Sequence, residues 1–493
     1  MDLDKGFDPA VLLKTAITQP LLGQIQDDPD EKRRIIIDTN LDYAGGREAA
    51  RDRIQVLIRT AIATVGNPSV TQSFRQSRGA ATHPYIFAEL QGKVIQEVVR
   101  LDRLQSEPAA LAIYRIWQDA EVHALINRSV STVKADAAQV SFSAVGKGIV
   151  WAVVDSGIDA LHPHFTQRKN LDLKAPVAHR DFTVPPGSLE APCVDAFGHG
   201  THVAGIVAGV MGAKYGQAPL AVTKSRDEQG AIQYAASPLE AISGMAPECK
   251  LVSYKVLDDR GSGLVSYIID ALETIQKLND YGRRILVHGV NMSVGYDFDP
   301  EWFACGQSPL CVEVDRLVRS GVVVVVAAGN TGYGYNQTAS RGSVASGMPL
   351  TINDPGNAEL AITVGSTHRD MPHIYGVSYF SSKGPTGDGR KKPDLVAPGE
   401  RILSCATGRT KADAVRKAGP GAQDFQYMED SGTSMAAPHV SGVIAAFLSI
   451  RGEFVGQPEK VKEIFLSTAT DLNRDRSFQG RGLVDLMRAI QSV

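Results

Sequence analysis

The chain has 493 residues, of which 43% are hydrophobic and 21% charged, and its formal net charge is −3. This near-neutral balance, with lysines and arginines scattered along the chain, gives no basic face for nucleic acid. No run of 18 or more apolar residues exists, so the sequence predicts no membrane-spanning segment and no membrane partner.

Residues 1–30 are predicted to be a polar lead-in. The start of the chain, Met1 to Asp8, is acidic and lacks the basic start and apolar core of a secretory signal, so a cytoplasmic location is expected. Most cysteines are then expected to be free thiols, although a Cys305–Cys311 bridge stays an alternative. The five cysteines show no metal-ligand spacing; they are at positions 193, 249, 305, 311 and 405.

Residues 31–125 predict a separate α+β domain. Strands are predicted at Arg34–Asp38, at Tyr85–Leu90 and within Ile113–Leu125, and one helix is predicted at Val94–Leu104. Another helix is indicated by apolar residues spaced along one helical face, namely Ile54, Leu57, Ile58, Ala61 and Val65. The order strand, helix, strand, helix, strand is compatible with a ferredoxin-like sheet.

The run Ile149–Val154 is apolar throughout and predicts a buried strand of a parallel sheet. Asp155 follows this strand, at the edge where open α/β sheets build their sites. Further along the chain, His199 stands between two glycines and precedes a helix rich in alanine and valine. Taken singly, Asp155 could cap a helix and His199 could be a buried hydrogen-bonded histidine.

Three further strands are predicted, at Leu251–Leu257, Ile285–Met292 and Gly321–Ala328. Glycines follow the first two, and these leave room for another backbone to approach. The third contains five consecutive valines and leads through Gly329 to Asn330. The amide of Asn330 could donate a hydrogen bond to a developing oxyanion, or it could simply open a turn.

Ser434 stands in a run from Ser431 to His439 that predicts the start of a helix. A serine hydroxyl becomes a nucleophile only when a base takes its proton and a third group orients that base. His199 and Asp155 are the residues available for these two roles. The alternative for Ser434 alone is an ordinary helix cap.

The segments around Asp155, His199 and Ser434 resemble, in this order, the three signatures of subtilisin-like serine proteases, the subtilase family. The resemblance covers roughly residues 126–493. It implies an α/β fold with a mostly parallel sheet and helices on both faces. It also implies an endopeptidase without a cofactor, in which Asp155, His199 and Ser434 form a catalytic triad, Asn330 stabilises the oxyanion, and the substrate is a polypeptide.

The resemblance also implies a substrate-binding cleft. An extended substrate would be clamped between two segments, which are Gly261, Ser262 and Gly263, and Ser293, Val294 and Gly295. One wall of the pocket for the residue before the scissile bond would be formed by Ala327, Ala328 and Gly329. Whether Asn353 and Asp354 line this pocket is open, and so is the primary specificity.

The domain at 31–125 resembles an inhibitory propeptide, which implies that the chain is its own intramolecular inhibitor and is cut after Leu125. The alternative is a processing protease dedicated to one partner, with a permanently attached regulatory domain. A third alternative, a non-catalytic peptide-binding module, is disfavoured by the intact triad. Two extra stretches, 210–243 and 407–423, would encode partner choice, and the first lacks regularly spaced oxygen ligands, so no metal site, including a calcium site, is predicted.

Overall fold

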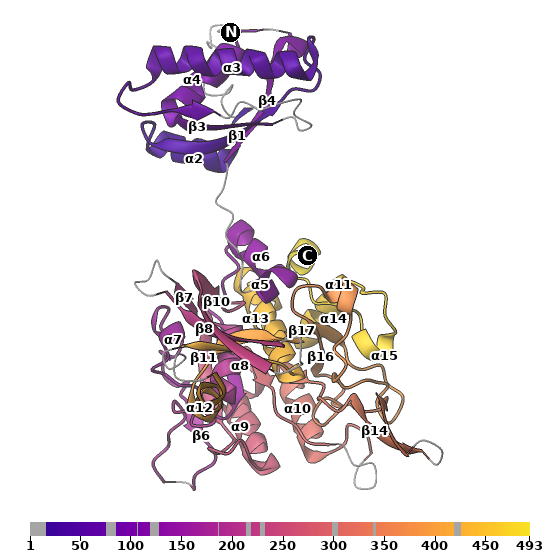
Figure 1. Cartoon of the computed structure of the whole chain (residues 1–493). Helices are drawn as coiled ribbons and strands as arrows, with labels where there is room; N and C mark the ends of the chain where they lie inside the picture. The colour runs from indigo at the N-terminus through magenta and orange to yellow at the C-terminus, as the bar shows by residue number, and fades with distance from the viewer. Residues whose placement is uncertain are drawn as a thin grey trace, which may run out of the picture. The chain divides into compact units, whose positions relative to one another are not determined.

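The computed structural model describes residues 16–74, 85–105, 107–118, 128–185, 187–212, 218–226, 232–297, 304–338, 342–418 and 425–493. The chain divides into two compact units, Met1–Ala124 and Leu125–Val493, each with its own core (Figure 1). The predicted cleavage position, Leu125, lies outside the described residues.

The N-terminal unit contains a four-stranded antiparallel sheet. Its strands, in sheet order, are β2 (Ser73–Phe74), β3 (Tyr85–Gln91), β1 (Lys32–Thr39) and β4 (Ile113–Gln118). Helices α3 (Gly46–Val65) and α4 (Gly92–Asp102) complete the chain order β1-α3-β2-β3-α4-β4, which is the βαββαβ order of ferredoxin-like units. The sequence did not predict β2, because a two-residue strand has no readable periodicity.

This unit begins before residue 31. Helix α2 (Gln19–Asp27) lies in the stretch predicted to be a polar lead-in, yet Leu21, Leu22 and Ile25 on it are buried in the core of the unit. Their spacing of one and four residues places them on one side of a helix. The lead-in therefore contributes to packing from α2 onward.

One face of the N-terminal sheet carries apolar side chains away from the core. Ile35 and Ile37 are fully buried, so Ile36 between them points to the opposite face. Ile36 pairs with Phe87 on one side and with Trp117 on the other. Trp117 is 41% exposed and has the guanidinium of Arg115 above its ring at 5.8 Å. This row, Phe87, Ile36 and Trp117, is called the outer sheet row below.

The second unit is built on a seven-stranded sheet in which every neighbouring pair is parallel. In sheet order its strands are β17 (Leu395–Glu400), β16 (Ile362–His368), β13 (Val323–Ala327), β12 (Gly289–Met292), β5 (Val150–Asp155), β11 (Lys250–Lys255) and β6 (Arg180–Asp181). The predicted parallel α/β fold is confirmed. The run predicted as a strand at 285–292 becomes strand β12 only from residue 289. One residue earlier, His288 N donates to Val150 O and Val323 N donates to His288 O.

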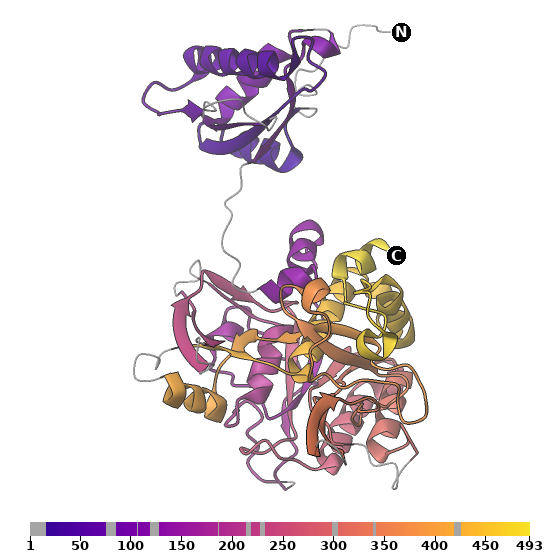
Figure 2. The same cartoon turned by 45° about the vertical axis from the view of Figure 1, so that its right-hand side comes forward.

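Helices cover both faces of this sheet (Figure 2). On one face, Trp151 and Val153 pack with α8 (His199–Val207), α13 (Thr433–Ile450), α14 (Pro458–Thr468) and α16 (Leu486–Gln491). On the other face, Ala152 and Val154 pack with α9 (Val265–Leu278) and α10 (Pro309–Arg319). Helix α13 is long and apolar enough to cross a membrane, but 83% of it is buried inside the unit, which makes it a core helix.

The remaining elements lie around this sheet. A four-stranded sheet contains, in order, β18 (Ile402–Cys405), β19 (Tyr427–Asp430), β8 (Leu220–Arg226) and β9 (Ile232–Pro238). Two-stranded sheets are formed by β7 (Val210–Gly212) with β10 (Ala241–Ser243), and by β14 (Tyr333–Thr338) with β15 (Gly342–Gly347). The short helices are α5 (Arg128–Thr132), α6 (Ala135–Phe142), α7 (Pro163–Thr166), α11 (Pro372–Tyr375), α12 (Gly408–Ala418) and α15 (Arg476–Gln479). The predicted extra stretch at 210–243 thus contains β8 and β9.

Candidate active site

The candidate residues meet at one edge of the parallel sheet. Strands β13, β12 and β5 are adjacent and parallel, so their carboxyl ends lie side by side. Asp155 is the last residue of β5, Ser293 follows β12, and Asn330 follows β13. This is the edge at which open α/β sheets place their ligands.

His199 is the first residue of α8 and is bound to Asp155. The distance from His199 Nδ1 to Asp155 Oδ1 is 2.8 Å. A carboxylate only accepts, so the Nδ1 proton belongs to the imidazole and Nε2 is left with a lone pair. Burial by itself would lower the pKa of His199, but the adjacent Asp155 carboxylate raises that pKa above its ordinary value of 6.5.

Asp195 fixes the turn that delivers His199, a role that the sequence did not reveal. Its Oδ1 accepts hydrogen bonds from Gly198 N at 2.7 Å and from Ser156 Oγ at 2.9 Å, and its Oδ2 accepts from Thr201 N at 2.8 Å. One buried carboxylate therefore ties the residue after Asp155 to the start of α8. The sequence signal that could have indicated this role is an aspartate four positions before the histidine.

Ser434 lies in the first turn of α13. Its Oγ donates a hydrogen bond to Ser293 O at 3.0 Å, while Ser293 Oγ donates to Ser434 O at 2.8 Å. These reciprocal bonds join the start of α13 to the end of β12. In this first helical turn, Thr433 N donates to Asn330 Oδ1 and Met435 N donates to Gly432 O. The backbone N–H of Ser434 lies between them at the helix N-terminus, where a negative charge is favoured.

Asn330 is oriented by Thr433. Asn330 Oδ1 accepts from Thr433 N at 2.9 Å and from Thr433 Oγ1 at 3.1 Å. Because two donors occupy the oxygen, the amide cannot be turned around, and Nδ2 is the group that can donate to an acceptor in the cleft. Gly329 precedes it with φ +108°, and a Cβ there would come within 2.7 Å of Asn353 Cγ.

These residues line one cleft of about 390 Å³, which includes His199, Asn330 and Ser434. Six of the residues predicted to bind substrate also line it, namely Gly261, Ser293, Val294, Gly295, Ala327 and Gly329. Ser262, Gly263 and Ala328 lie outside the lining. Ala328 is fully buried, and its carbonyl holds the cleft residue Asn353 by accepting a hydrogen bond from Asn353 N at 3.0 Å. Gly263 is pressed against Val256 O, to which a Cβ would come within 2.2 Å.

The cleft has further walls that the sequence did not assign. Phe197 packs against Gly261, where a Cβ would come within 2.6 Å of the ring, and its ring centroid is 6.4 Å from that of His199. Leu257 and Thr331 also line the cleft, as does Asn353, whose place was left open. Asp354 is buried instead. These residues come together because they lie near the ends of different strands, so no local sequence pattern marks them as cleft residues.

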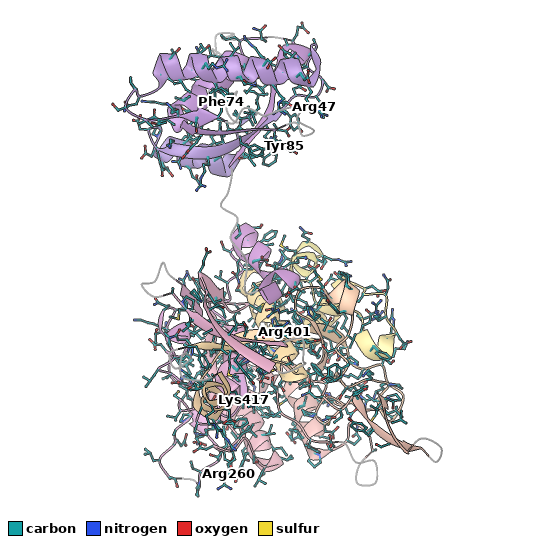
Figure 3. The ribbon with its side chains drawn as sticks, viewed as in Figure 1. Arg47, Phe74, Tyr85, Arg260, Arg401 and Lys417 are labelled. Carbon is teal, nitrogen blue, oxygen red and sulfur yellow. The ribbon has the colours of Figure 1, made fainter. Side chains whose placement is uncertain are left out.

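The extra stretch at 407–423 contains α12, on which Lys417 is labelled in Figure 3, and the start of this helix contacts the segment that leads to the cleft residue Phe197. Arg409 N donates to Ala196 O at 2.8 Å, and Thr410 N donates to Phe197 O at 3.1 Å. The start of α12 therefore holds the segment that presents Phe197 and His199.

A buried lysine anchors the opposite wall. Lys383 is 6% exposed, and its Nζ donates to Gly332 O at 2.6 Å, Tyr379 O at 3.0 Å and Ser381 O at 3.2 Å. Gly332 follows the cleft residue Thr331, so three carbonyls near the cleft converge on one ammonium group. Burial lowers the pKa of Lys383.

Within the described residues, no group of three His, Cys, Asp or Glu side chains could hold a metal ion. All five cysteines are free thiols. Burial raises the pKa of the Cys193 thiol to about 11. A larger cavity, of about 800 Å³, lies at the amino ends of β5 and β11, where it is lined by Val150 and Lys250. It contains none of the candidate residues, so its size does not make it the site.

Comparisons with known proteins agree with this geometry. Residues 146–483 match the model of the subtilase family. Serine protease AprX of Bacillus subtilis is 30% identical over 387 residues, which cover 77% of this chain and 74% of that protein. Subtilisin E of the same organism is 29% identical over 73% of this chain and 70% of its own length. The major intracellular serine protease of B. subtilis is 31% identical over 65% of this chain and 74% of its own length.

Proposed function

The chain belongs to the subtilase family and is a serine endopeptidase that acts on polypeptides, and we propose that it is made as a zymogen whose N-terminal unit inhibits the catalytic unit until it is cut off. The observation that carries the catalytic assignment is that His199, which is hydrogen-bonded to the buried Asp155, lines one cleft with Ser434 and Asn330.

In the proposed mechanism, Nε2 of His199 takes the proton of Ser434 Oγ as this oxygen attacks the scissile carbonyl. The Ser434 hydroxyl must then exchange its present acceptor, Ser293 O, for His199. Asp155 stabilises the imidazolium that forms. His199 next protonates the leaving amine, and water repeats the sequence to release the acyl group from Ser434.

The negative charge that develops on the carbonyl oxygen would be met by Asn330 Nδ2 and by the N-terminal turn of α13. The extended substrate would run between Gly261 on one side and Ser293, Val294 and Gly295 on the other, pairing with their backbone. The side chain before the scissile bond would enter between Ala327 and Asn353.

Two features support the inhibitory role of the N-terminal unit. It has a core of its own, so it can act as a folded body. Its outer sheet row presents Trp117, which is 41% exposed, on the face away from the core, where another surface could pack against it. A tethered unit that delivers its connecting strand to the cleft acts at high effective concentration, so the cut should fall at or near Leu125.

The test compares purified wild-type protein with Ser434→Ala. Removing residues 1–125 of 493 takes about 125/493 of the 52.8 kDa chain, roughly 13 kDa, and leaves about 39 kDa. Wild-type protein should show both fragments and should react with a fluorophosphonate at Ser434. The variant should stay full length and unlabelled. An active wild-type enzyme that stays uncut would mean that the N-terminal unit is permanent, which is the alternative of a dedicated processing protease.

We also propose a cytoplasmic location. It is supported by the free state of all five cysteines, which suits a reducing compartment, and by the printed name of one relative, the major intracellular serine protease. Cell fractionation with an antibody against the catalytic unit tests it. Recovery of the mature form outside the cell would contradict it.

A further inference from the structure

The hairpin of β14 and β15 carries an exposed aromatic surface beside the cleft. Tyr333 and Tyr335 lie on the same face of β14 because they are two residues apart. They are 46% and 74% exposed. Tyr379 is 66% exposed and packs edge-on against Tyr333, with ring centroids 5.6 Å apart. Tyr333, Tyr335 and Tyr379 are called the tyrosine face.

The neighbouring side chains leave these rings open. Across the hairpin, Tyr333 pairs with Gly347 and Tyr335 pairs with Ala345. Glycine and alanine are too small to cover an aromatic ring, although cross-strand partners usually stabilise such rings by packing. Tyrosine set among glycine, serine and other small residues is the composition of recognition loops, in which rigid aromatic rings supply contact area at low entropic cost.

The base of the hairpin is fixed to the wall of the cleft. Gly332 N donates to Phe380 O at 3.0 Å, and Met348 N donates to Gly332 O at 2.9 Å. Thr331, which lines the cleft, donates through Oγ1 to Asn353 Oδ1 at 3.1 Å. Only Gly332 separates this residue from Tyr333 along the chain, so the tyrosine face begins next to a residue of the cleft wall.

An isolated two-stranded hairpin is marginally stable in water, and exposed apolar surface is unfavourable unless it is covered in use. The hydrogen bonds at its base thus hold this hairpin in place. The described residues across the hairpin do not cover its tyrosines. A surface that is held rigidly, opens directly from the cleft and carries no charged residue on the described parts of β14 and β15 suits a flexible polypeptide with apolar side chains.

We propose that the tyrosine face is an exosite that binds an unfolded segment of the polypeptide substrate while a more distant segment occupies the cleft. The proposal rests on the site described under the proposed function and deepens it by naming the substrate class. Substrates favoured by this exosite are long, unfolded chains with apolar side chains outside the stretch that is cleaved.

The test uses two substrates, casein and a blocked tetrapeptide amide with a chromogenic leaving group. The double variant Tyr333→Ala/Tyr335→Ala should lower kcat/KM for casein about tenfold, mainly through KM, which is the order expected of an interface hot spot. Hydrolysis of the tetrapeptide should not change, because four residues fill the cleft without reaching the tyrosine face. Tyr375→Ala is the matched control: Tyr375 is 64% exposed, and α11, which carries it, lies at the other end of the unit from β14 in Figure 1, so this change should affect neither substrate.

Equal losses on both substrates would mean that the tyrosines support the cleft itself, and no loss on casein would mean that the face is not used; either result overturns the proposal. A wild-type dimer that becomes a monomer in the double variant, with casein cleavage unchanged, would assign the face to a second copy and would also overturn it. Failure of the proposed function is distinguishable, because it would appear as absent tetrapeptide hydrolysis and absent fluorophosphonate labelling of Ser434 in the wild type.

Discussion

The Asp155 carboxylate lies beneath His199 with 1% of the residue exposed. Its Oδ1 accepts from His199 Nδ1 and from Ser156 N, whereas Oδ2 has no hydrogen-bond partner among the described residues. A buried negative charge with few donors acts strongly on its nearest neighbour, because the surroundings screen it weakly. The pKa of the His199 imidazole is therefore raised mainly by one carboxylate, that of Asp155.

With His199 as the proposed general base, its raised pKa is expected to set the pH dependence of the reaction. Only neutral imidazole accepts the serine proton, so kcat/KM should rise with pH and reach half of its maximum above pH 6.5. From the sequence alone, with an unshifted histidine, the loss of activity would be expected below about pH 6–7. A pH series of tetrapeptide hydrolysis measures the midpoint, and a flat profile from about pH 5 to 8 would rule out a histidine base.

Asn330→Ala should lower kcat by about 10²–10³-fold with little change in KM, a magnitude measured in subtilisin itself for the loss of such a donor. The reason is that Nδ2 acts on charge that develops only in the transition state. The variant also removes the acceptor of Thr433 N and Thr433 Oγ1, so its melting temperature should be measured beside the kinetics. Steady-state kinetics with the tetrapeptide substrate measure kcat and KM separately. A change confined to KM would place Asn330 in substrate binding instead.

At the scale of elements, one buried charge cluster joins β17 to α14. Asp394, just before β17, accepts from Lys392 Nζ at 2.6 Å and from Thr363 N at 2.8 Å, and it pairs with Lys462 of α14 at 3.2 Å. The two lysines outweigh the effect of burial and hold the pKa of Asp394 below its ordinary value. The Asp394 carboxylate thus compensates the charges of two lysines at the amino end of β17, whereas the candidate site lies at the carboxyl ends of its strands.

Asp394→Ala should destabilise the catalytic unit by about 3–5 kcal/mol, because it leaves the buried Lys392 and the partly buried Lys462 without their counter-charge. In the wild type, the lowered pKa means that this contribution is present above pH 3.8 and is lost as the pH falls through the folded-state value. Thermal unfolding of an uncut Ser434→Ala background measures both effects. An unchanged melting temperature at pH 7 would show that the cluster contributes nothing.

Hydrophobic runs and glycines in the sequence predicted the parallel sheet and the residues at its strand ends, because buried strands have a strong local signature. The same runs overestimated β12, since Ile285, Leu286 and Val287 are apolar but lie outside the register of the sheet. Phe197, Asp195 and Lys383 escaped prediction for another reason. Their roles depend on contacts with segments far along the chain, such as Gly261 for Phe197, and one sequence does not show those contacts.

At the scale of the whole molecule, the N-terminal unit has a hydrophobic core separate from those on the two faces of the parallel sheet, and 22 of the described residues are buried in it. That core is enough for a compact body, yet the outer sheet row leaves apolar surface unused within the unit. An inhibitor needs such a surface, because its affinity must come from contacts outside the cleft as well as inside it.

Trp117→Asp should leave the N-terminal unit folded, since the side chain is on the outer face, but it should weaken inhibition of the catalytic unit. Matured enzyme should then show activity with a shorter lag and less of the fragment of roughly 13 kDa bound. Progress curves and co-purification of the fragment measure this. Tyr114→Asp, at a position on β4 that is 60% exposed and thus more accessible than Trp117, is the control. Identical lags in the wild type and both variants would remove the outer sheet row from the inhibitory contact.

Lys383 affects how the cleft wall responds to the salts in the medium. A ring of carbonyl oxygens attracts cations, and a dissolved ion would fill such a ring only in proportion to its concentration. Here the ammonium group is attached to the chain, so dilution, dialysis or competition by other salts does not empty the ring formed by the carbonyls of Gly332, Tyr379 and Ser381. The wall that holds Thr331 against the cleft is thereby buffered against changes in the ionic composition of the medium.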